Sequence, residues 1–277
     1  MPRPTVVVTR PEPESAAWVQ ELGAAGWPAL ALPLLRLAPA RGEQSLHAVW
    51  HQAQHCHAWM FVSAAAVRFF FAARPADWRP TAPLPRSWAP GPGTAQVLRR
   101  MWAQLGVPDA PVDEPAADAL QFDSEALWAR VSAQVQPGFR LLLVRGDSDT
   151  PQRDEAGRAA AGSALPGVGR DWLTQRSLAR GADVQAVVAY ERRLRTWSDP
   201  ADAQALQHAL ALSLWQVSNR EALHALAAVP AQQWGNKTAI VTHPRIAQAA
   251  QDVGFGRVLH CEPGVPALIA ALKSLTT

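Results

Sequence analysis

Two kinds of strand–helix unit each occur twice in this sequence, and this repetition restricts the possible folds more than any other feature. The first unit reads TVVVTRP, a helical stretch and PALALPLLRL, and it returns as RLLLVRGD, GRDWLTQRSLARG and ADVQAVVAYERRL. Its first strand ends at Arg10 in one copy and at Arg145 in the other, and its helix ends at Gly26 or Gly181. Glycine at that position is typical of a helix C-cap.

The second unit joins a strand ending in serine to a helix, a further strand and a tight turn. One copy contains WMFVSAAAVRFFF and APGPGTAQVLRRMWAQLG, and the other contains LWQVSNREALHAL and VTHPRIAQAAQDVGFG. Ser63 and Ser218 are 155 residues apart, and Gly91 and His243, which open the turns, are 152 residues apart. Two offsets that agree this closely indicate an internal duplication.

Short apolar strands that alternate with amphipathic helices predict α/β domains with parallel sheets and helices on both faces. A chain of 277 residues suits two such three-layer domains better than one. Ligands of these folds bind at the carboxyl ends of the strands. The candidate site therefore comprises the loops that begin at Arg10, Ser63, Gly91, Arg145, Ser218 and His243.

The composition argues against several classes of protein. Hydrophobic residues make up 48% of the chain and charged residues 18%, which is enough apolar material for a folded core. The net charge is only +3 and no run of five basic residues occurs, so nucleic acid is not an expected partner. No segment has the length of a signal peptide's apolar core or of a membrane span, so we expect a cytoplasmic protein with no membrane contact.

Neither the cysteines nor the histidines form a pattern typical of a metal site. Cys56 and Cys261 are far apart and lack the spacing of zinc ligands. Four histidines lie on a polar helix and at its end, where a solvated helix face explains them better than metal ligation does: His47, His51, His55 and His57.

Residues 147–166 interrupt the second copy of the first unit, between its strand and its helix. The segment DSDTPQRDEAGRAAAGSALP is polar, rich in alanine and glycine, and without apolar periodicity. It predicts a mobile surface insertion.

Taken in order, these segments resemble the uroporphyrinogen-III synthase family over nearly the whole chain. The resemblance rests on VTRPEPESAAWVQELGAAGWPALALPLLRL, FVSAAAVRFF, APGPGTAQVL, FDSEALW, LLLVRGD, GRDWL, VVAYERR, VSNREAL, VTHPRIAQAA and CEPGVPALIAAL. It implies flavodoxin-like topology, with domain one formed by 1–36 and 192–277 and domain two by 39–188. Segments Pro33–Leu37 and Val187–Arg192 would form a two-stranded connector, which would act as a hinge over a cleft between the domains.

The resemblance also implies a reaction. The family cyclises hydroxymethylbilane, a linear tetrapyrrole with eight carboxylates, into uroporphyrinogen III, with loss of water and inversion of the last ring. The substrate is reactive by itself, so the enzyme mainly has to fold and position it. By resemblance we expect no metal or cofactor, a monomer, and at most transient contact with hydroxymethylbilane synthase.

Tyr190, the only tyrosine of the chain, matches the family's tyrosine near the cleft. Its hydroxyl would hydrogen-bond to the leaving hydroxyl group or assist its departure. The alternative is a strand tyrosine that packs at a domain edge.

The turn PGPGTAQ has accessible backbone N–H groups at Gly91 and Gly93 and opens a helix, whose N-terminus attracts carboxylates. Thr94 would cap this helix or bind a substrate carboxylate. The alternative is an ordinary strand-to-helix turn.

The serines and arginines at strand ends also have two explanations each. Ser63 and Ser218 are either helix N-caps or carboxylate ligands. Arg10 and Arg145 either bind substrate carboxylates or pair with nearby acids, Arg10 with Glu12 or Glu14 and Arg145 with Asp147 or Asp149. Gly146 and Asn219, which follow Arg145 and Ser218, complete the predicted substrate contacts.

The turn THPRIA departs from the family pattern, which has Gly-Pro followed by hydroxyl residues. Here His243 replaces the glycine, and Arg245 and Ile246 replace the hydroxyl residues. Arg245 would bind carboxylates by charge, and His243 is either a substrate contact or a cap. Two other functions stay open: a two-lobed ligand-binding protein without catalysis, and a relative of the family that has lost activity.

Overall fold

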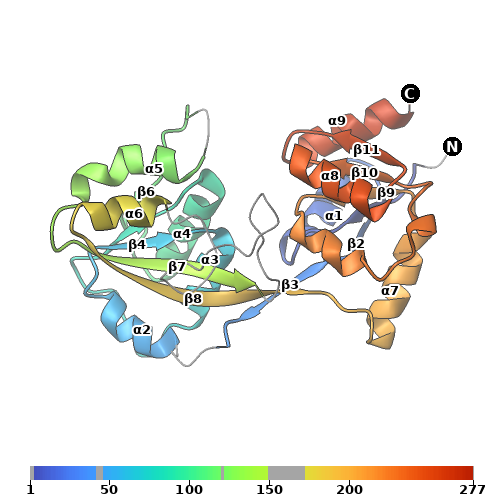
Figure 1. Ribbon diagram of the computed structural model, residues 1–277. Coiled ribbons are helices and arrows are strands. Elements are labelled where there is room, and N and C mark those ends of the chain that lie inside the picture. Colours follow the sequence, from blue (N-terminus) through green and yellow to red (C-terminus); the bar gives the residue numbers. More distant parts are fainter. Residues whose placement is uncertain (1–2, 42–45, 120–121, 149–171, 277) are drawn as a thin grey trace. The chain divides into compact units, whose positions relative to one another are not determined.

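Short runs of valine, leucine and aromatic residues form the strands of two separate sheets (Figure 1). The computed structural model describes residues 3–41, 46–119, 122–148 and 172–276. The chain divides into unit 1, which comprises Met1–Leu37 and Arg193–Thr277, and unit 2, which comprises Ala38–Arg192. It therefore begins unit 1, builds unit 2 from one continuous segment, and then completes unit 1.

Unit 1 contains, among the described residues, a five-stranded parallel sheet of order β11-β10-β9-β1-β2. Its strands are β1 (Val6–Val8), β2 (Ala29–Ala31), β9 (Leu214–Val217), β10 (Thr238–Val241) and β11 (Arg257–His260). Its helices are α1 (Glu14–Ala24), α7 (Pro200–Leu210), α8 (Pro244–Val253) and α9 (Val265–Thr276), with short 3-10 helices at Glu221–Leu226 (η2) and Ala231–Gln233 (η3).

Alternation along the strands of unit 1 sends side chains to two apolar layers. Val6 and Val8 face one layer together with Leu22 of α1 and Leu268 of α9. Val7 and Trp215 face the other layer, which also holds side chains of α7, η2 and α8. Period-two alternation in a buried sheet thus gives a three-layer unit, as the sequence predicted.

Unit 2 is built on a six-stranded sheet, within the part of the chain that the structure describes, of order β3-β8-β7-β4-β5-β6. Its strands are β3 (Leu35–Pro39), β4 (Ala58–Phe61), β5 (Arg86–Trp88), β6 (Val112–Asp113), β7 (Arg140–Ser148) and β8 (Asp183–Leu194). Its helices are α2 (Leu46–Ala53), α3 (Ala64–Ala72), α4 (Pro92–Gln104), α5 (Ser124–Val131) and α6 (Trp172–Ala179), with a 3-10 helix at Ser132–Gln134 (η1).

Helices cover both faces of this sheet too. Met60 and its neighbours in the sheet face Leu127 of α5 and Leu173 of α6. Trp59 points to the opposite face, where it stacks on Trp102 of α4 at 5.7 Å between ring centroids and meets Trp50 of α2 edge-on at 5.4 Å. Four tryptophans, Trp50, Trp59, Trp78 and Trp102, thus contact one another in this layer of unit 2.

The two sheets place corresponding strands in the same spatial order. The order β2-β1-β9-β10-β11 of unit 1 matches β8-β7-β4-β5-β6 of unit 2, in which β7 and β8 come from the second copy of the first unit. Unit 1 has the flavodoxin-like order in chain sequence. Unit 2 reaches the same arrangement as a circular permutation, because its β4 to β6 precede β7 and β8 in the chain.

The strands β3 and β8 carry the chain between the units and are neighbours in the sheet. The amide of Ala40 donates to the carbonyl of Ala189, and the amide of Arg195 donates to that of Leu34, so the two strands run antiparallel. The predicted connector segment Val187–Arg192 is part of the main sheet, since it pairs with β7 up to Ser148.

Two further expectations can be compared with the structure. Asp147 and Ser148, which were predicted to start the insertion, instead extend β7; residues 149–166 of the predicted insertion lie outside the described residues. None of the described helices is both long and apolar enough to cross a membrane.

Candidate functional site

Four of the predicted site residues lie where the strand order reverses in each sheet. Such switch points lie between β1 and β9 in unit 1 and between β7 and β4 in unit 2, and in open α/β sheets ligands bind at the carboxyl ends of the strands beside them. Arg10 and Ser218 follow the two strands at the first switch point. Ser63 and Gly146 lie at the second.

Ser63 connects the first turn of α3 to Tyr190 of β8. Its Oγ accepts a hydrogen bond from the Ala66 amide at 3.1 Å, which makes it the N-cap of α3. The same Oγ lies 3.2 Å from Oη of Tyr190. Since the amide uses one lone pair of Ser63, the serine hydroxyl can donate to the phenol oxygen and leave the phenol hydrogen available for another acceptor.

A β-bulge determines which face of the sheet Tyr190 occupies. Arg145 is opposite Val188, but the next residue, Gly146, is opposite Tyr190, so Ala189 is an extra residue in β8. In regular pairing, Tyr190 would share a face with Val184 and the helices α5 and α6. The bulge turns it to the α3 face, where it stacks on Phe69 at 5.6 Å and 20° between ring planes.

Gly146 provides the space that the phenol ring occupies. A Cβ added to Gly146 would lie 2.7 Å and 2.8 Å from Cε1 and Cε2 of Tyr190, and nearer still to Cζ. The tyrosine is only 6% exposed. The sequence placed Gly146 among the substrate contacts; in the structure its contact is the tyrosine ring.

Arg145 does not end its strand, contrary to the prediction. β7 continues through Ser148, and the Arg145 side chain is fully buried. Its equivalent in the first copy, Arg10, follows a strand that ends at Val8. The depth of Arg145 favours a structural role, because a guanidinium at 0% exposure lacks direct access to a ligand in solvent.

The glycine turn lies at the same edge of unit 2, because β5 pairs in parallel with β4. Gly91 is the N-cap of α4 in extended conformation, without a side-chain cap, and Pro92 occupies the first turn. Thr94 was predicted as a possible cap; it lies instead inside the first turn and is 8% exposed. The uncapped helix N-terminus therefore keeps backbone N–H groups for an anionic ligand.

A hollow of about 550 Å³ adjoins this turn and includes residues that sequence reasoning missed. Gly93 lies on its wall beside Arg99, which pairs with Glu114. Phe122 also lines it and is 47% exposed, an unusual position for a phenylalanine. The available signal was local: Phe122 directly precedes Asp123, the N-cap of α5, and a hydrophobic residue before a cap usually packs against its helix.

In unit 1, Arg10 bridges the switch point. Its Nη1 donates to Ser218 Oγ at 3.1 Å, its Nη2 lies 3.7 Å from Oε2 of Glu14, and its guanidinium lies 4.7 Å from the ring centroid of Trp18. The predicted pairing with Glu14 is thus present. The arginine also keeps a position at the strand edge with a side-chain exposure of 28%.

Ser218 is not a helix N-cap, although the duplication suggested one. The N-cap position of η2 is Arg220, and Asn219 before it supplies the side-chain acceptor: its Oδ1 accepts hydrogen bonds from the amides of Glu221 at 2.8 Å and Ala222 at 3.4 Å. Ser218 Oγ accepts from Arg10 instead. The second copy has therefore shifted the cap by one residue and freed the serine for a side-chain contact.

His243 is the N-cap of α8, in the position that Gly91 has at α4. Its Nδ1 accepts a hydrogen bond from the Arg245 amide at 3.1 Å, so the capping alternative holds. His243 and Arg245 are exposed at the carboxyl edge of β10. This helix start carries Arg245 and Ile246 where the corresponding turn in unit 2 carries Gly93 and Thr94.

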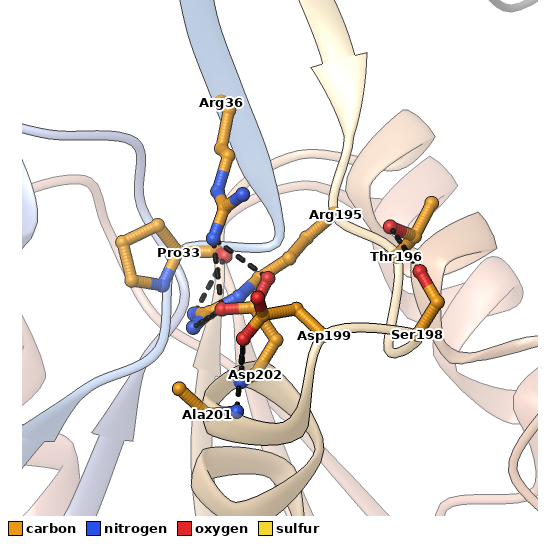
Figure 2. A network of polar contacts seen from close by, with 8 residues as sticks. All are labelled: Pro33, Arg36, Arg195, Thr196, Ser198, Asp199, Ala201 and Asp202. Atoms are coloured by element: carbon orange, nitrogen blue, oxygen red, sulfur yellow. Dashed lines mark hydrogen bonds and ion pairs between the residues drawn. The ribbon is translucent and has the colours of Figure 1, made fainter.

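The carboxylate of Asp202 accepts hydrogen bonds from Arg36 and Arg195, which lie where the chain leaves unit 1 and where it returns to it (Figure 2). Asp202 of α7 accepts hydrogen bonds from Arg36 at 2.8 Å and 2.7 Å and from Arg195 at 2.7 Å. Its side chain is 8% exposed, and Arg195 is the main cause of its lowered pKa. Arg195 also donates through its amide to the Leu34 carbonyl at 2.9 Å, so this cluster fixes both strands to α7.

Comparison with known proteins gives a family and several solved structures. The family model for uroporphyrinogen-III synthase HemD matches residues 16–160, slightly more than half of the chain. The similar solved structures include a mutant uroporphyrinogen III synthase from Thermus thermophilus, at 14% identity, 98% coverage of both chains and a TM-score of 0.49. Another uroporphyrinogen III synthase structure from that bacterium is 12% identical, with 99% coverage of both chains and a TM-score of 0.38.

The family assignment rests on the match to the family model. That match includes β4 and β7, which flank the switch point of unit 2, and the glycine turn after β5. The chain belongs to the uroporphyrinogen-III synthase family, whose members are lyases of tetrapyrrole biosynthesis.

Proposed function

We propose that this chain converts hydroxymethylbilane into uroporphyrinogen III and water, with the reacting groups at the carboxyl edge of the unit 2 sheet. The observation that carries this proposal is the contact between Tyr190 Oη and Ser63 Oγ at the switch point, 3.2 Å long, with Gly146 beneath the ring. The cluster is the one place in the described chain where a bulge, a glycine and a helix cap together orient one hydroxyl group.

Tyr190 would assist the departure of the substrate's hydroxyl group. The phenol donates its proton to that oxygen, the carbon–oxygen bond breaks with the help of the pyrrole nitrogen's electrons, and water leaves. The hydroxyl of Ser63, already held by the Ala66 amide, donates to the phenolate oxygen and stabilises it. The proton lost when the ring closes balances the one that Tyr190 gave, so the tyrosine is regenerated.

Each unit, taken by itself, offers donors that would bind carboxylates. In unit 2 these are the uncapped N-terminus of α4 at Gly91 and Gly93. In unit 1 they are Arg10, which retains side-chain exposure beside Ser218, and Arg245 at the start of α8. The positions of the eight carboxylates determine the geometry in which the two ends of the linear tetrapyrrole meet. This geometry is the part of the reaction that a protein can control.

The proposal needs no cofactor, because the substrate carries its own leaving group. We further propose that the protein acts as a monomer in the cytoplasm. Its substrate would come from hydroxymethylbilane synthase, through free diffusion or a transient contact.

The test supplies hydroxymethylbilane, generated in place by its synthase, and identifies the isomer of the product. The proposal expects the type III isomer in the presence of the protein and the type I isomer in its absence. Exclusive formation of type I would reject the enzyme. Saturable binding of the substrate together with that result would instead identify a two-lobed binding protein or a relative that has lost its activity.

A further inference from the structure

Gly146 is the position where the structure and the sequence prediction give different roles. The glycine is buried, and its φ lies outside the left-handed range, so the backbone there would accept alanine without strain. The contacts nearest to an added Cβ are all ring atoms of Tyr190. The requirement for glycine at 146 therefore comes from the close approach of one side chain.

The ring of Tyr190 has few alternatives to its present place. It stacks on Phe69, its hydroxyl contacts Ser63, and the bulge at Ala189 sets the direction in which the side chain leaves β8. Contact distances below 3 Å for a Cβ do not occur without movement of a neighbour. Because the atoms that must move belong to the far end of a side chain, a methyl group at 146 would displace the phenol before it disrupted the sheet.

We infer that Gly146 is a positioning residue for Tyr190: it has no side chain so that the phenol can lie against β7 with its hydroxyl at Ser63. This inference rests on the proposed role of Tyr190 in the reaction. It also replaces the earlier expectation that Gly146 touches substrate. Gly146 acts through the tyrosine alone, and its effect on catalysis disappears when the phenol hydroxyl is absent.

The single tyrosine of the chain makes this inference directly measurable. Protein labelled with 3-fluorotyrosine reports Tyr190 through ¹⁹F resonances that no other residue contributes. We expect Gly146→Ala to shift or broaden these resonances, to lower kcat roughly tenfold, and to lower the unfolding midpoint, because the added methyl group overpacks a buried site. The matched control is Gly23→Ala in α1, where no atom lies within 4 Å of the new methyl group; it should leave the ¹⁹F spectrum and kcat unchanged.

A double variant separates the inference from the proposed function. In a Tyr190→Phe background, Gly146→Ala should change kcat less than twofold, because the hydroxyl that it displaces is already gone. A full tenfold loss in that background would overturn the inference and return Gly146 to direct contact with substrate. Unmoved ¹⁹F resonances in Gly146→Ala would overturn it as well.

The remaining outcome concerns the function alone. If the ¹⁹F resonances move in Gly146→Ala while kcat of that variant and of Tyr190→Phe stays at the wild-type value, Gly146 does position Tyr190. The catalytic role of the tyrosine is then wrong. Structural and catalytic failures thus give different spectra and different rates.

Discussion

The two switch points have the same strand order but hold their polar residues differently. In unit 1, Ser218 after β9 accepts a hydrogen bond from the guanidinium of Arg10, which also pairs with Glu14. In unit 2, the serine after β4 caps a helix and contacts a phenol, that of Tyr190. Duplication has therefore kept the scaffold while one edge carries charge and the other carries hydroxyl groups.

This difference fits a division of labour in the proposed reaction. Exposed arginines attract and orient carboxylates, since charge-assisted hydrogen bonds are strong and tolerate some freedom in the ligand. Proton donation needs one hydroxyl at one place, and the bulge, Gly146 and Ser63 supply that restraint. We therefore expect unit 1 variants to change substrate affinity and unit 2 variants to change turnover.

The largest effect on stability should come from Asp202→Asn, which tests whether ion pairs hold unit 1. The variant leaves Arg195, a largely buried arginine, without its counter-charge, so the free energy of unfolding should fall by about 2–3 kcal/mol. The control is Asp199→Asn at the N-cap of the same helix, because asparagine also serves as an N-cap. Urea denaturation measures both; equal losses would contradict a specific role for the Asp202 cluster.

The contribution of Asp202 to the free energy of unfolding should be lost at acidic pH. Its hydrogen bond with Arg195 lowers the pKa of the carboxyl group below the usual 3.8. The ion pair therefore contributes fully above the unfolded-state pKa of about 3.9, and its contribution is lost as pH falls through the folded-state pKa. The stability difference between wild type and Asp202→Asn should be constant from pH 7 to pH 5 and narrow below about pH 4. A constant difference down to pH 2 would contradict the assignment.

Smaller effects on stability and turnover should distinguish Ser63 from Ser218. Ser63→Ala removes the cap of α3 and the partner of Tyr190, so unfolding free energy should fall by about 1 kcal/mol and kcat roughly fivefold. Ser218→Ala removes a partly exposed contact while Asn219 keeps its capping bonds, so its effect on stability should stay below about 0.5 kcal/mol. If the two variants behaved alike in both measurements, the contrast between the switch points would be wrong.

Local patterns predicted the architecture well, because strands and helices follow from apolar periodicity and the repeat exposed equivalent elements. Gly26 and Gly181 follow helix ends with positive φ, as their C-cap role requires. The turn residues Gly91 and His243 are equivalent helix N-caps. Chain order alone did not reveal that unit 2 is a permuted copy, since strand order depends on pairing between distant segments.

The site was predicted less completely, because its geometry depends on contacts across the sheet. The bulge at Ala189 adds one residue to an otherwise regular strand, and nothing in VVAYERR distinguishes it from regular pairing. Ser218 lost its expected capping role to Asn219 because the two helix starts differ in detail. Arg145 resembled Arg10 in sequence, but a longer strand buried it.

The division between the two edges is tested most directly by steady-state kinetics of Tyr190→Phe and Arg245→Ala with hydroxymethylbilane. We predict that Tyr190→Phe lowers kcat roughly ten- to a hundredfold with KM near the wild-type value. Arg245→Ala should raise KM roughly tenfold with kcat little changed. Wild-type kcat in Tyr190→Phe, or a loss confined to KM, would contradict the placement of the reacting hydroxyl at the edge of unit 2.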